Sequence, residues 1–159
     1  MAKAVVDNVV VVQPWRTWAR TVAIGAGTGL AFWLLTILLN RYIIEPWACR
    51  QIVNATFCVG SNAIAGNIAA VLAGVIALVV MIRLRVVLPI VITVMSAALL
   101  WDLAAWTAGL VPYEVLLWSV GLYAVSFGLF GWITRYSRLW VIISLSVLIV
   151  LIVRIAILL

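Results

Sequence analysis

The stretch Ile64–Ile82, IAGNIAAVLAGVIALVVMI, carries no charged side chain and decides the fold class. The hydrocarbon core of a bilayer is about 30 Å thick and a helix rises about 1.5 Å per residue, so about 20 apolar residues cross it. Four other runs meet or approach this length. The sequence therefore predicts an all-α, polytopic membrane protein, a bundle of five transmembrane helices over residues 22–44, 64–82, 86–106, 115–133 and 139–159. The number of spans is four if the last segment lies in the membrane interface.

Composition agrees with this class and excludes several others. Of the 159 residues, 69% are hydrophobic and 9% are charged, and the mean hydropathy is +1.35, whereas soluble domains are about half apolar and about a quarter charged. Histidine is absent, which removes the commonest general base and metal ligand. The basic residues flank apolar runs singly and form no patch for nucleic acid. We expect no catalytic site, cofactor, metal or nucleic-acid partner, and we expect the lipid bilayer as surroundings.

The distribution of Lys and Arg predicts the orientation, because short loops rich in these residues stay in the cytoplasm. If the spans alternate, seven basic residues fall on one side: Lys3, Arg16, Arg20, Arg83, Arg85, Arg135 and Arg138. Three fall on the other: Arg41, Arg50 and Arg154. We therefore expect residues 1–21 to be a cytoplasmic N-terminal segment, residues 22–159 to be the transmembrane domain, residues 45–62 to be an outer loop, and the C-terminus to lie outside.

Small residues recur on three of the predicted spans, at four-residue spacing on the first two and less regularly on the fourth. In lipid, such residues let helix backbones approach closely, and this packing replaces the hydrophobic drive between helices. One interpretation is that the first two spans pack together as a hairpin through these faces. The other is an interface with a second copy or with a membrane-protein partner. The residues are Gly25 and Gly29, then Gly66, Ala70 and Gly74, then Gly121 and Gly128.

Cys49 and Cys58 are the two cysteines of the chain, and both fall in the predicted outer loop. Disulfides persist outside the cytoplasm, and a bridge across this short loop would stabilise the fold by roughly 2 to 3 kcal/mol. The sequence therefore predicts a structural disulfide. Thiol exchange is the alternative, although redox-active pairs are usually arranged as CxxC.

Asp102 and Arg154 are ionisable residues inside predicted spans, where charges are costly and often functional. Counted from the basic residues Arg85 and Arg138, the two lie at the same depth, toward the outer edge of the membrane. They are predicted to form an ion pair between the third and fifth spans. Two alternatives are separate snorkelling to water and a site that gates ions or protons. No Gly or Pro interrupts a span near its middle, which disfavours transporters built from broken helices.

Together these observations favour a non-enzymatic membrane protein, a structural or accessory subunit that packs through its small-residue helix faces. A small oligomeric channel or transporter is the alternative, with Asp102 and Arg154 near its outer mouth. A thiol–disulfide or quinone-linked redox protein is a third class, which the lack of histidine and of CxxC disfavours.

Overall fold

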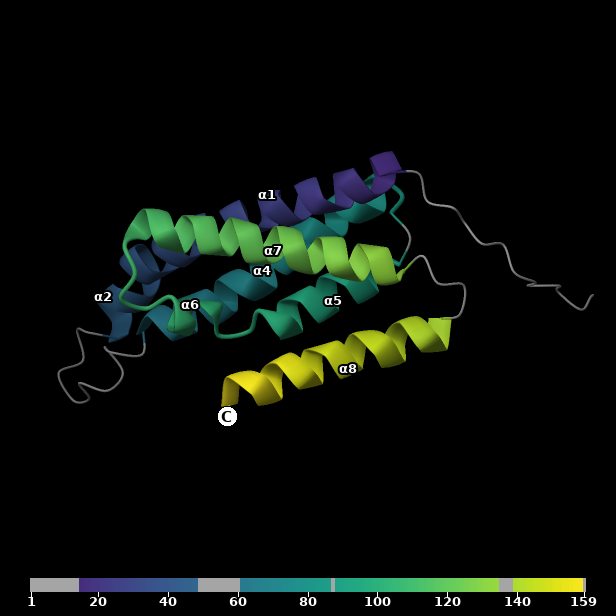
Figure 1. Cartoon of the computed structure of the whole chain (residues 1–159). Coiled ribbons are helices and arrows are strands. Elements are labelled where there is room, and N and C mark those ends of the chain that lie inside the picture. The colour runs from purple at the N-terminus through teal and green to yellow at the C-terminus, as the bar shows by residue number, and fades with distance from the viewer. Residues whose placement is uncertain (1–14, 49–60, 87, 135–138, 159) are drawn as a thin grey trace, which may run out of the picture.

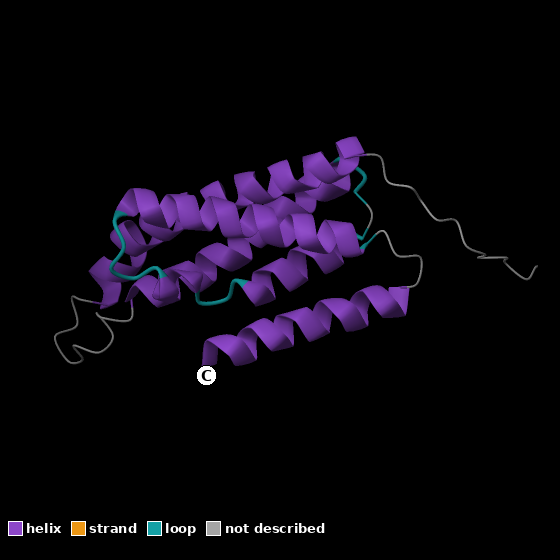
Figure 2. Cartoon of the chain, viewed as in Figure 1, coloured by secondary structure: helices purple, strands orange, loops and turns teal. Residues whose placement is uncertain are grey.

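The computed structural model describes residues 15–48, 61–86, 88–134 and 139–158. These residues form helices and turns with no strand (Figure 2). The long helices are α1 (Trp15–Leu39), α4 (Ser61–Arg83), α5 (Pro89–Leu99), α7 (Pro112–Ile133) and α8 (Leu139–Leu158). Three short helical segments accompany them: η1 (Asn40–Ile44), α2 (Glu45–Ala48) and α6 (Leu103–Trp106). The predicted all-α membrane bundle is confirmed.

Within the described part of the chain, four helical segments are long and apolar enough to cross a membrane. They are Trp15–Ile44, Ser61–Arg83, Pro89–Trp106 and Pro112–Ile133. The last helix, α8, contributes a shorter apolar stretch, Trp140–Ala156. In Figure 1 it runs along the outside of the bundle, where it contacts α5 and, less extensively, α7.

Two predicted spans differ from the observed helices. The first begins at Trp15 rather than near Val22, because tertiary contacts extend it: the Trp18 indole N–H donates to the carbonyl of Gly128 on α7 at 3.1 Å. The third is not one helix over residues 86–106. It ends at Leu99 and resumes as α6 at Leu103, for reasons described with the site below.

The centre of the bundle is the antiparallel contact between α1 and α7, to which α4 adds a layer on α1. Buried aromatic residues fill this contact: the rings of Phe32 and Tyr123 lie 5.5 Å apart, and that of Phe127 lies 6.4 Å from Tyr123. The buried face of α4 consists mainly of alanines, namely Ala65, Ala69, Ala70, Ala73 and Ala77. Large rings on one side and methyl groups on the other fill the interior at close packing.

Two glycines of α1 allow this close approach. A methyl group at Gly25 would lie 2.7 Å from the carbonyl oxygen of Tyr123, and one at Gly29 would lie 2.7 Å from Cα of Val120 and still closer to the Ser119 carbonyl oxygen. Both glycines therefore face α7. The first two spans do contact each other, as α1 and α4, but Gly25 and Gly29 serve the contact with α7 rather than that hairpin.

The small residues of α4 and α7 have different neighbours. Gly66 faces Cβ of Ala104 on α6, and Gly74 faces the methyl group of Thr93 on α5. The buried Ala70 belongs to the core cluster. Gly128 lies against Val22 of α1, while a methyl group at Gly121 would meet no atom within 4 Å. The two glycines of α4 thus pack against α5 and α6, the two parts of the third span, whereas Gly121 lies at the surface.

The α1–α7 contact makes a prediction about Gly29. We expect Gly29→Ala to lower the free energy of unfolding by about 1 to 3 kcal/mol, because the added methyl group overlaps backbone atoms of α7 that cannot rotate away. The measurement is denaturant unfolding in detergent. Gly27→Ala is the matched control, since a methyl group there meets nothing within 4 Å and the change removes a helix-weakening glycine. Equal effects of both variants would contradict the close contact.

Candidate functional site

The third predicted span breaks between α5 and α6 without a glycine or proline. Asp102 adopts the left-handed conformation, with φ 66° and ψ 14°, at a cost of about 1–2 kcal/mol for an L-residue. At this break the Ala105 N–H bonds back to the Asp102 carbonyl at 2.8 Å, and the Leu103 N–H bonds to Leu100 at 3.1 Å. The carbonyls of Ala98 and Trp101 and the N–H of Asp102 therefore lose their regular helical partners.

Asn67 on α4 satisfies one side of this break. Its side-chain oxygen accepts the Asp102 N–H at 3.3 Å, and its Nδ2 donates to Asp102 Oδ1 at 3.1 Å. One amide thus replaces the missing helical acceptor and also orients the carboxylate. Asn67 was not among the residues that the sequence pattern indicated. The sequence feature that could have indicated it is a lone amide in the apolar run Ile64–Ile82. It follows Gly66, the residue of α4 against which Ala104 packs.

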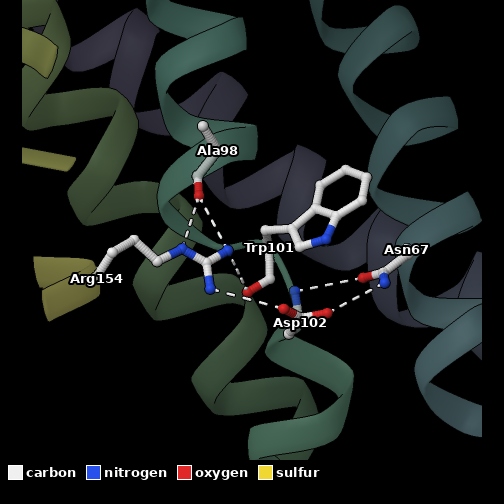
Figure 3. Close-up of polar contacts among 5 residues, drawn as sticks. All are labelled: Asn67, Ala98, Trp101, Asp102 and Arg154. Atoms are coloured by element: carbon white, nitrogen blue, oxygen red, sulfur yellow. Dashed lines mark hydrogen bonds and ion pairs between the residues drawn. The ribbon is translucent and has the colours of Figure 1, made fainter. Parts of the chain in front are cut away.

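Arg154 on α8 satisfies the other side. Its Nε and Nη2 donate to the Ala98 carbonyl at 3.3 and 3.2 Å, and Nη2 also donates to the Trp101 carbonyl at 2.9 Å. Its Nη1 lies 3.6 Å from Asp102 Oδ2, and its guanidinium carbon lies 5.5 Å from the centroid of the Trp106 ring. Figure 3 shows Arg154 and Asn67 reaching the broken turn from opposite sides. We call Asn67, Asp102 and Arg154, with these two carbonyls, the polar clasp.

The structure thus brings Asp102 and Arg154 together, but their ion pair is the weaker part of the clasp. The side chains of Arg154 and Asp102 are 26% and 40% exposed, and their 3.6 Å separation is long for a charge-assisted hydrogen bond. By contrast, three hydrogen bonds of 2.9 to 3.3 Å join the guanidinium of Arg154 to the carbonyls of Ala98 and Trp101. In a bilayer, an unsatisfied backbone carbonyl costs several kcal/mol. The stronger role of Arg154 is therefore to bind carbonyls and fix α8 to α5.

This arrangement corrects one expectation from the sequence. The third span is discontinuous although no Gly or Pro interrupts it, because an aspartate, which tolerates the left-handed region better than most residues, stands at the break. Its side chain and backbone are bonded by Asn67, and its neighbours' carbonyls by Arg154. The polar clasp therefore binds the backbone of the broken turn and the carboxylate of Asp102. Among the described residues, no group of three or more His, Cys, Asp or Glu is positioned to hold a metal ion.

Cys49 and Cys58 lie outside the described residues, so the disulfide between them stays a prediction.

Comparisons with protein-family models, with curated proteins and with solved structures found no match to this chain.

The clasp makes a prediction about the relative importance of its two charges. We expect Arg154→Met to lower the free energy of unfolding by about 2 to 4 kcal/mol, because two carbonyls lose their donors. Asp102→Asn should cost less than Arg154→Met, since an amide oxygen still accepts from Asn67. Denaturant unfolding in one detergent measures both. The swap Asp102→Arg with Arg154→Asp should not restore stability, and full rescue would mean that the ion pair, not the carbonyl contacts, holds α8.

Proposed function

We propose that this chain is a non-catalytic integral membrane protein, a structural or accessory subunit that packs against other membrane proteins within the bilayer. The polar clasp is the observation that carries the proposal. Ionisable residues inside a membrane usually mark function, but here Asp102 and Arg154 bind Asn67 and the carbonyls of one broken turn. The hydrogen bonds of these two side chains thus stabilise the fold itself. The apolar exterior is then the surface that remains for partners.

The packing of the core supports the same proposal. The backbones of α1 and α7 approach at Gly25 and Gly29 until no methyl group fits, and aromatic rings occupy the adjoining space. A pathway for ions needs polar groups along a continuous opening. The close α1–α7 contact favours a scaffold over a pore through this chain alone.

The proposal includes five spans with the N-terminus in the cytoplasm and the C-terminus outside. In Figure 1, α8 runs alongside the other helices, as a spanning helix does and an interfacial one does not. The start of α1, with Arg16 and Arg20, and the end of α4, with Arg83 and Arg85 just after it, lie at one end of the bundle (Figure 1). The described arginines of the other end are Arg41 and Arg154, and short loops rich in arginine favour the cytoplasm. Glu45, Asp102 and Glu114 belong to the opposite end. The proposed disulfide between Cys49 and Cys58 would then be outside.

This orientation is tested with the two native cysteines. In intact cells that express the protein, a membrane-impermeant maleimide should label it only after an impermeant reductant has opened the disulfide. Labelling without the reductant would keep the orientation and contradict the disulfide. Labelling only after lysis would place the loop in the cytoplasm and contradict the orientation. A variant with both cysteines replaced by alanine gives the background.

If one face of the bundle binds a partner protein, crosslinking to protein should occur from that face and not from the others. A photoreactive amino acid is placed at one exposed position at a time: Ile76 on α4, Val125 on α7 or Leu151 on α8, which are 51%, 68% and 52% exposed. We expect one face to give a protein adduct of discrete mass and the others to react with lipid. The mass separates a second copy of this chain from a different subunit. Adducts at no position would contradict the accessory role.

The second candidate is a small channel or transporter, and the broken third span favours it, since discontinuous helices often form substrate sites in transporters. Ion flux into liposomes that contain the purified protein distinguishes the two functions. An accessory subunit should give no ion flux above that of protein-free liposomes under an imposed potential. Flux that is present with the native chain and lost in Asp102→Asn would establish the transport function instead.

A further inference from the structure

A pocket of about 190 Å³ opens beside α6, and α6 lies at the opposite end of the bundle from the start of α1 (Figure 1). It lies between α1, α4, α6 and the start of α7. We call it the α6 pocket and define it by the residues that matter below: Phe32, Trp33, Thr36, Asn62, Thr107 and Ala108. Thr36 and Thr107 are buried, whereas Ala108 and the neighbouring lining residue Leu110 are exposed. The pocket therefore has a polar, buried wall and an apolar mouth at the surface.

The hydrogen bonds of the wall determine what it can bind. The Thr36 hydroxyl donates to the Phe32 carbonyl at 2.8 Å, and the Thr107 hydroxyl donates to the Leu103 carbonyl at 2.9 Å. Both hydroxyl hydrogens are thus used, while the oxygen lone pairs remain free to accept. Asn62 donates from Nδ2 to the Ala104 carbonyl at 3.3 Å, which leaves its Oδ1 as a third acceptor beside one remaining Nδ2 hydrogen. The wall favours a ligand that donates a hydrogen bond.

Charge and size narrow the ligand further. None of the described lining residues is charged, so burial of an ionised group there would lack a counter-charge and is disfavoured. A cavity of about 150 Å³ accepts benzene, and this pocket, at about 190 Å³, accommodates one six-membered ring with two or three added heavy atoms. The aromatic rings of Phe32 and Trp33 supply the apolar contacts that such a ring prefers.

We propose that the α6 pocket binds a neutral aromatic ring that carries a hydroxyl group, a phenol. The ring lies against Phe32 and Trp33, and its O–H donates to an oxygen of Thr36, Asn62 or Thr107. The ligand enters past the exposed Ala108 and Leu110 of the connector between α6 and α7. Because α6 forms the wall and is held by Asn62 and the polar clasp, the site is complete only while the third span keeps its break.

The experiment measures ¹⁹F NMR of 4-fluorophenol and of 4-fluorotoluene with the full chain in detergent. The two probes have nearly the same shape and differ in the donor, and loss of one hydrogen bond corresponds to about a fivefold change in affinity. We expect saturable broadening of 4-fluorophenol at concentrations about fivefold lower than for 4-fluorotoluene. Ala108→Trp should close the mouth and abolish the saturable part, which also gives the background from micelles. Ala105→Trp, exposed on α6 a few residues before Ala108 and outside the lining, should leave binding unchanged.

A second variant keeps the pocket open and removes one acceptor. Thr107→Val has nearly the same shape as threonine and should weaken 4-fluorophenol binding while leaving 4-fluorotoluene unaffected. Two results would overturn the proposal: equal binding of the two probes by the native chain, or saturable binding that Ala108→Trp leaves intact. A pocket filled only by water would give no saturable broadening with either probe, which overturns it as well.

Discussion

The structure depends on one constraint of the bilayer: every backbone N–H and carbonyl within it must find a partner inside the protein. Regular helices meet this constraint by themselves, and the break at Asp102 does not. There, Asn67 accepts the stranded N–H and Arg154 donates to two stranded carbonyls. The same bonds fix α6 against α4 and α8 against α5. A single irregular turn thereby determines how the third and fifth helices are attached to the rest of the bundle.

The other three long helices are joined by a different mechanism. Apolar side chains gain little from leaving lipid for another apolar surface, so association requires close contact between helices. Gly25 and Gly29 allow the backbone of α1 to approach α7, and Gly66 allows α6 to approach α4. Large rings then fill the spaces beside these contacts. The bundle therefore combines a core held by dispersion with a third span and an outer helix held by polar bonds.

The short helix α6 connects the two proposals. One end carries Asp102 and belongs to the polar clasp, while Ala104 and Thr107 form a wall of the α6 pocket. Only four residues long, α6 keeps its position through bonds to Asn62 and Asn67 of α4 rather than through its own helical hydrogen bonds. A ligand in the pocket and the contacts of Arg154 from α8 would therefore act on the same element from two sides. A scaffold role and a bound phenol are compatible on this architecture.

The sequence by itself determined the fold class, because the length and apolarity of Ile64–Ile82 and the other runs exclude a soluble domain. It also indicated that Asp102 and Arg154 lie at the same level, since a helix has a fixed rise per residue. Tertiary structure alone decided which faces meet. Glycine spacing marks a close contact but does not name the partner, so α7 rather than α4 receives Gly25 and Gly29. The break, the role of Asn67 and the carbonyl contacts of Arg154 were equally hidden, because a left-handed aspartate is stable only where other helices supply the bonds it forfeits.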